Sequence, residues 1–118
     1  MEITGFKELY EQLDKIRNSQ RKLNTFVAQQ GEILRGEAIN NTPKDTGLLR
    51  QSWRRSRATQ SKCEVYNNVE YAGHVEYGHR TRNGGFVKGS KMLHKAMLTH
   101  KKEFIENTKD ILRNILND

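Results

Sequence analysis

The sequence predicts an α+β fold, with a long N-terminal helix, a small antiparallel sheet that includes a short inserted helix, and a long C-terminal helix. Three observations support this. Apolar residues recur at helical spacing over about the first 40 residues and again after residue 90. Between these stretches the apolar and polar residues alternate as in strands. The only proline, Pro43, separates the first helical stretch from the alternating part.

The first stretch predicts one amphipathic helix that runs to Asn40 or Asn41. Its apolar residues follow one another at steps of three, four and seven, which places them on one stripe. They are Phe6, Leu9, Leu13, Ile16, Leu23, Val27 and Leu34. Pro43 lacks a backbone donor and disfavours helical angles at Thr42, so the helix should end just before it.

Four residues interrupt the apolar stripe of this helix. Gln20 and Gln30 are polar positions on the apolar face, and Gly31 and Gly36 weaken its last third. We therefore expect a bend or a closely packed neighbour near the glycines.

A corner is predicted after the proline. Asp45 and Thr46 can bond nearby backbone groups, and Gly47 can adopt a positive φ, so the three residues form a turn. Arg50 is placed to bond back to Asp45 or to Glu76. We interpret Asp45, Thr46, Gly47 and Arg50 as structural residues.

The middle of the chain predicts a hairpin and a short helix. Residues 48–56 and 62–67 alternate as two strands around a turn at 58–61, although the turn lacks an Asn-Gly pair. Residues 69–78 predict one or two helical turns that Gly78 ends as a C-terminal cap.

A basic, glycine-bearing loop follows, and then the last helix. The loop is a candidate contact with another subunit or partner through Gly78, His79, Arg80, Arg82, Gly84, Gly85 and Phe86. Residues 86–88 are compatible with a short third strand. The last helix is expected from Ser90, as its cap, to about Asn117, with an apolar stripe made of Leu93, Ala96, Met97, Phe104, Ile111, Leu112, Ile115 and Leu116.

The length of 118 residues suits a single domain, here residues 1–118. At 34% hydrophobic, the chain has little apolar material for its own core, so other copies or partners should cover part of its surface. No apolar run approaches the about 20 residues that span a bilayer. The first residues lack the features of a signal peptide, so we expect the cytosol of the producing cell as the site of synthesis.

The net charge of +7 lies mostly in the middle of the chain. Residues 1–43 sum to zero, residues 44–91 to +6 and residues 92–118 to +1. Arg54, Arg55 and Arg57, together with Trp53 and Tyr66, are compatible with a basic, aromatic sheet face that grips phosphates or stacks bases. The alternative is that Trp53 packs under the long helices while the arginines face solvent.

The residues that could carry chemistry do not form a recognisable site. His74, Glu76 and His79 lie close together with Glu70 nearby, but positions two apart on a helix do not share a face, and two ligands do not hold a metal. No nucleophile elbow and no phosphate-binding glycine loop occurs. A single cysteine, Cys63, excludes an internal disulfide. We therefore expect no enzyme, no cofactor, no metal and no small-molecule substrate.

Three segments together resemble one family of phage proteins. They are TPKDTGLLRQSW, YNNVEYAGHVEYGHRT and GFVKGSKMLHKAM, in this order. They resemble the lambdoid-phage gene-product-ten family of tail components, which are head–tail joining or tail-completion proteins of long-tailed phages and prophages. The resemblance covers roughly residues 4–115. In the third segment the family commonly has prolines, and this chain has none.

The resemblance implies a non-enzymatic part of the virion neck or tail. It implies a homo-oligomeric ring between the head connector and the tail tube, in contact with proteins of both, and assembly in the host cytoplasm. Proximity to genomic DNA would be non-specific, and no membrane is involved. The alternative from the residues is a DNA-binding protein of a mobile element that uses the basic central segment.

Overall fold

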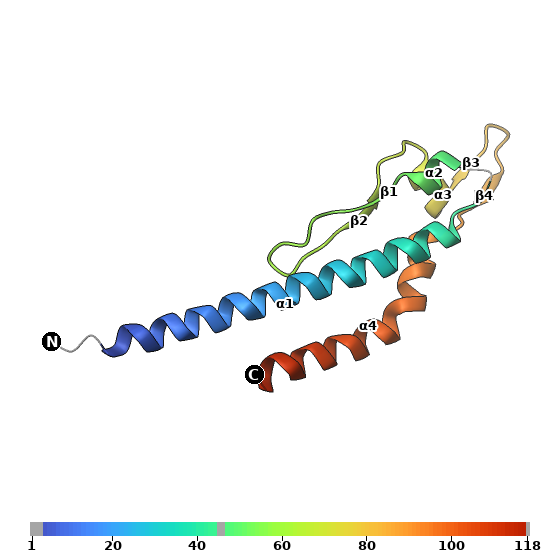
Figure 1. Cartoon of the computed structure of the whole chain (residues 1–118). Coiled ribbons are helices and arrows are strands. Elements are labelled where there is room, and N and C mark those ends of the chain that lie inside the picture. The colour runs from blue at the N-terminus through green and yellow to red at the C-terminus, as the bar shows by residue number, and fades with distance from the viewer. Residues whose placement is uncertain (1–3, 45–46, 118) are drawn as a thin grey trace.

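The chain forms two long helices, with two small hairpins and two short helices between them (Figure 1). The computed structural model describes residues 4–44 and 47–117. Its elements are α1 (Thr4–Asn41), α2 (Gly47–Gln51), β1 (Trp53–Arg55), β2 (Val65–Asn67), α3 (Ala72–Tyr77), β3 (Gly78–Arg80), β4 (Phe86–Lys88) and α4 (Met92–Asn117). The predicted α+β architecture is confirmed.

The molecule is elongated, with extents of 82 × 25 × 23 Å. α1 has 38 residues, and at 1.5 Å per residue it measures about 57 Å. α4 starts beside the C-terminal end of α1 and runs back along it, but its own end lies well short of the start of α1 (Figure 1). The first turns of α1 therefore project beyond the rest of the molecule, and we call residues 4–18 the α1 overhang.

α1 ends where the proline predicts, and the end is held by the tryptophan. Thr42 caps the last turn because its Oγ1 donates to the carbonyl of Ala38 at 2.7 Å. The indole Nε1 of Trp53 donates to the same hydroxyl oxygen at 2.8 Å. Trp53 is 3% exposed and lies in the core with Ala38, Leu49, Met92 and Ala96. The interpretation of Trp53 as a core residue is confirmed.

Residues 47–51 form a helical turn, so the prediction of a strand from Leu48 is wrong. Ser52 closes this turn: its backbone N–H donates to Leu49 and its Oγ donates to Leu48. The turn buries Leu49 completely. The strand starts only at Trp53.

The first hairpin pairs β1 with β2 in antiparallel register, with Trp53 opposite Asn67. At the tip of this hairpin, Thr59 and Lys62 form an isolated antiparallel β-bridge. The two residues of the turn between them, Gln60 and Ser61, both have positive φ. A two-residue turn with two positive φ values has the twist that a tight hairpin needs. The predicted hairpin is confirmed, although the turn uses no glycine.

The strands do not form one sheet. β3 and β4 pair with each other as a second two-stranded antiparallel sheet, in which Arg80 lies opposite Phe86. The predicted loop is therefore partly strand. Gly78 ends α3 with φ +88°, as predicted for its cap, and a side chain there would run into the backbone of β4.

α4 is capped by Glu76 rather than by Ser90. The carboxylate of Glu76 accepts from the backbone N–H of Leu93 and of His94 at 3.0–3.1 Å. A carboxylate at this position satisfies donors that no helical carbonyl reaches and complements the helix dipole. Ser90 instead donates its backbone N–H to Val75.

A buried polar pair joins the two long helices. Nε2 of His100 lies 2.7 Å from Oε1 of Gln30, and both side chains are less than 9% exposed. One turn further along, the rings of Phe26 and Phe104 stack at a centroid distance of 6.3 Å. Gln30 therefore does not merely interrupt the apolar stripe of α1, because it aligns α1 with α4.

Candidate assembly surfaces

The predicted corner is only partly described. Asp45 and Thr46 lie outside the described residues. Gly47 begins α2 without a positive φ, and a Cβ there would meet nothing within 4 Å, so the expectation of a strained glycine is wrong. Glu76 is engaged by the N-terminus of α4 and shows no contact with Arg50.

The arginines of the first hairpin mostly bind the protein itself. Nε of Arg55 donates to Oε1 of Glu32 on α1 at 2.8 Å, and this hydrogen bond raises the pKa of the Arg55 guanidinium above its ordinary value. Nη1 of Arg54 donates to two backbone carbonyls at 2.6 and 3.1 Å. Of the three, Arg57 alone is exposed without such a bond among the described residues. The structure does not gather Arg54, Arg55 and Arg57 into one free basic face.

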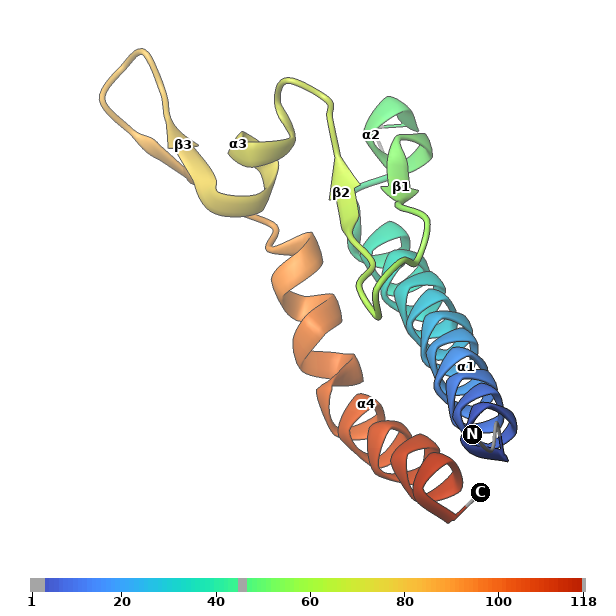
Figure 2. The same cartoon turned by 90° about the vertical axis from the view of Figure 1, so that its left-hand side faces the viewer.

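The second hairpin projects from the end of the molecule opposite the overhang (Figures 1 and 2). Except for Gly78, every residue of β3 and β4 is exposed, including Phe86 at 65%. Gly84 has φ +82° in the connecting turn, where Thr81 binds Gly85 through both backbone and side chain. The candidate contact residues are thus brought together on one projecting ribbon.

The histidines and acids of α3 do not form a metal site. The rings of His74 and His79 meet edge to face at a centroid distance of 5.5 Å, while Glu76 turns away to α4. In the described part of the chain, no three His, Cys, Asp or Glu side chains come together in a group that could hold a metal.

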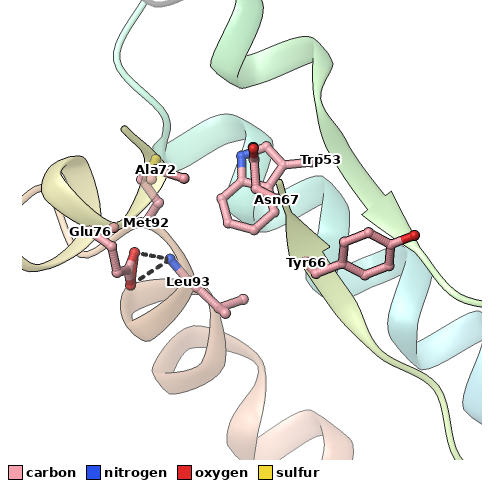
Figure 3. A pocket seen from close by; sticks show the side chains of 8 residues that line it. Trp53, Tyr66, Asn67, Ala72, Glu76, Met92 and Leu93 are labelled. Atoms are coloured by element: carbon pink, nitrogen blue, oxygen red, sulfur yellow. Dashed lines mark hydrogen bonds between the residues drawn. The ribbon is translucent and has the colours of Figure 1, made fainter. Parts of the chain in front are cut away.

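A shallow hollow lies between the first hairpin, α3 and the start of α4 (Figure 3). Its volume is about 130 Å³, and Trp53, Tyr66 and Met92 line it. Its only carboxylate, that of Glu76, points to the backbone of Leu93 (Figure 3). The hollow therefore offers an apolar wall with no free acid, base or nucleophile.

Two apolar stripes on the long helices are exposed. The first lies on the α1 overhang and consists of Leu9, Tyr10, Leu13 and Ile16. It continues the same stripe that α4 and the first hairpin cover further along α1. We call it the overhang stripe.

The second exposed stripe lies on α4. It consists of Leu98, Ile105, Leu112 and Leu116, and we call it the outer α4 stripe. Steps of seven, seven and four residues keep these side chains on one helix face. The sequence interpretation did not separate this stripe and placed Leu112 and Leu116 in one stripe with the other apolar residues of the helix. The seven-residue spacing was the available signal.

A family of phage proteins matches most of the chain. Residues 7–78, more than half of the chain, match a protein-family model described as "Bacteriophage HK97-gp10, putative tail-component". This places the chain in the class of phage tail components. The chain belongs to the HK97-gp10-like family, as the resemblance of its motifs indicates. The third motif, from residue 85, lies outside the matched range.

No curated protein and no solved structure matches the chain. As a tail component, the protein belongs to the virion, where it contacts other structural proteins of the phage. Within the described residues, no helix is both long and apolar enough to span a membrane.

Proposed function

We propose that this tail component is a non-enzymatic head–tail joining or tail-completion protein that assembles as a ring between the head connector and the tail tube. The observation that carries the proposal is the pair of exposed apolar stripes, which the chain's own residues leave uncovered. Contiguous exposed apolar surface on a protein marks an interaction site.

The stripes suit repeated helix-to-helix contacts between copies. Tyr10 and Ile16 are 66% and 65% exposed, and Leu98 and Leu116 are 60% and 81% exposed. Full burial of a Leu or Ile side chain contributes about 1.5–3 kcal/mol. Two different stripes on one chain allow a head-to-tail contact, in which one copy's overhang stripe packs on the next copy's outer α4 stripe. Such contacts close into a ring when the rotation between copies is fixed.

The second hairpin is the proposed contact with another component of the neck. Its residues project at the end of the molecule opposite the α1 overhang and take no part in the core (Figure 1). In this proposal the protein is made and assembled in the host cytoplasm. The rival function, a DNA-binding protein of a mobile element that uses the basic central segment, loses the contribution of Arg54 and Arg55, because both are engaged internally.

The test replaces two residues of the overhang stripe, Leu13→Lys with Ile16→Lys, in a phage that lacks its own copy of the gene. The expected result is DNA-filled heads and separate tails in electron micrographs, and no rings of the purified variant. The matched control, Gln12→Lys with Asn18→Lys, adds the same charge on exposed polar positions and should restore joined particles.

Both variants should keep the thermal midpoint of the wild type, because substitutions at exposed positions change stability by about 0.5 kcal/mol or less. Infectious particles at wild-type yield from Leu13→Lys with Ile16→Lys would overturn the assembly role of the stripe. Joined particles in the complete absence of the protein would overturn the function itself.

A further inference from the structure

One continuous stretch of the chain is purely basic. Residues 77–102 contain seven lysines and arginines and not one aspartate or glutamate. The net charge of this stretch is +7, which equals the net charge of the whole chain. Its basic residues are Arg80, Arg82, Lys88, Lys91, Lys95, Lys101 and Lys102.

Within residues 4–44 and 47–117, these cations have no carboxylate partner in an ion pair. Among the described residues, ion pairs join Asp14 to Arg17, Glu32 to Arg35 and Arg55, and Asp110 to Arg113, and Nδ1 of His100 lies 3.8 Å from Oε2 of Glu103. None of the seven basic residues takes part in an ion pair within the described ranges. The acid that precedes the stretch, Glu76, is held by the backbone of α4.

The second hairpin presents its cations on a narrow ribbon. Gly78 pairs with Lys88 and Arg80 with Phe86, so Arg80 and Lys88 lie on one face of the ribbon. Arg82 stands in the turn at its tip, and Lys91 and Lys95 follow at its base, where α4 begins. All five side chains are exposed. A two-stranded ribbon is narrow enough to enter the major groove of duplex DNA.

The uniform sign indicates the class of partner. Protein surfaces carry both signs of charge interspersed, whereas the DNA backbone is anionic throughout. A continuous segment of the chain with seven cations and no acid matches the DNA backbone better than it matches a folded protein. One edge of the Phe86 ring lies over Gly78, while the ring itself is 65% exposed on the same ribbon face as Arg80 and Lys88.

We propose that the β3–β4 hairpin and the first turns of α4 bind the sugar–phosphate backbone of duplex DNA, independently of base sequence. This inference rests on the proposed function in one respect. The proposed function has the second hairpin contact another component of the neck, and we identify that component as the DNA that passes between head and tail. The binding site differs from the first-hairpin arginines that the sequence suggested, of which Arg54 and Arg55 bind the protein itself.

The test measures the affinity of the full-length protein for a labelled mixed-sequence DNA duplex by fluorescence anisotropy. The NaCl concentration runs from about 50 to about 200 mM, because affinity that comes from phosphate contacts falls steeply over this range. The variant Arg80→Gln, Arg82→Gln, Lys88→Gln removes three cations of the ribbon. The control Lys7→Gln, Lys15→Gln, Lys62→Gln removes three exposed cations elsewhere, so both variants have the same net charge, +7 − 3 = +4.

The ribbon variant should bind more than tenfold more weakly, and the slope of log K against log salt should fall by about 2 to 3, since each phosphate contact contributes about 0.9. The control should change affinity less than threefold. Equal losses in both variants, no binding of the wild type at 50 mM salt, or tighter binding to polyglutamate than to DNA would each overturn the inference.

The two proposals fail separately. Self-association and particle joining depend on the helix stripes, so a protein that assembles but does not bind duplex DNA refutes only the DNA contact. A protein that binds DNA through the ribbon but forms no ring, and whose loss leaves joined particles, refutes only the assembly function.

Discussion

The two hairpins of this protein have strands of the same length and opposite surroundings. Both pair two three-residue strands in antiparallel register. The first lies along α1 and is fixed at both ends: Trp53 is buried at its base, and at its tip the N–H of Ser61 donates to Asn24 at 2.8 Å. Within the described residues, the second is held by its own ladder, by its junctions with α3 and α4 and by the edge-to-face contact of His79 with His74.

The difference shows which hairpin is part of the fold and which is available to a partner. An isolated two-stranded hairpin is marginally stable in water. The first gains stability from α1, through the Arg55–Glu32 pair and the close approach at Gly31. The second buries no side chain, so an external surface such as DNA can stabilise it on binding.

The largest expected effect is at the base of the first hairpin. Trp53→Ala should lower the free energy of unfolding by about 3–5 kcal/mol, because a large buried ring is lost and Thr42 loses a donor. Chemical denaturation followed by circular dichroism measures it. A loss below 1 kcal/mol would show that this hairpin does not depend on the core.

The next effect is at the contact between the first hairpin and α1. A Cβ at Gly31 would lie 2.8 Å from Sγ of Cys63 and 2.9 Å from Cδ of Arg55, so Gly31→Ala should cost about 1–2 kcal/mol as the hairpin is displaced. Gly36→Ala is the matched control on the same helix. It meets nothing within 4 Å and should stabilise the protein by about 0.5–1 kcal/mol. Equal stabilisation by both substitutions would mean that the first hairpin does not make a close steric contact with α1 at Gly31.

A smaller effect is expected where the second hairpin joins the fold. Glu76→Gln removes the negative charge at the N-terminus of α4 and should cost about 1 kcal/mol. Glu70→Gln, at an exposed position that precedes α3, serves as the control and should leave the denaturation midpoint unchanged. If both variants unfold alike, the cap does not stabilise α4.

The smallest effect is expected in the second hairpin itself. Phe86→Ala should change the free energy of unfolding by about 0.5 kcal/mol or less, since the ring is already exposed. Amide hydrogen exchange sharpens the contrast: His79 and Val87 should exchange much faster than Arg54 and Tyr66 in the free protein. Equal protection of the two hairpins would remove the distinction between them.

The sequence predicts those parts of the fold that local patterns determine. The repeating apolar stripe and Pro43 define α1, and alternation around a turn defines the first hairpin, even though Gln60 and Ser61 replace the usual glycine. Leu48 to Gln51 were assigned to a strand because their alternation is ambiguous over four residues, and burial of Leu49 decided for a helical turn.

Contacts between distant residues could not be predicted. Gln30 and His100 are 70 positions apart, and nothing in either neighbourhood indicates that they meet. The same holds for Glu76, whose carboxylate caps a helix that begins 16 residues later. The candidate contact loop was located correctly in the chain, but its pairing as a ribbon and the engagement of Arg54 and Arg55 follow from tertiary packing.

The buried Gln30–His100 pair also limits the shapes that this protein can adopt. Two long helices joined by aliphatic side chains alone can slide by one heptad, a shift of about 10 Å. Such a slip would bury an amide and an imidazole with no hydrogen-bond partners, which costs about 1–3 kcal/mol for each group. Every copy should therefore have the same angle between its helices, and identical wedges are what a closed circle of subunits requires.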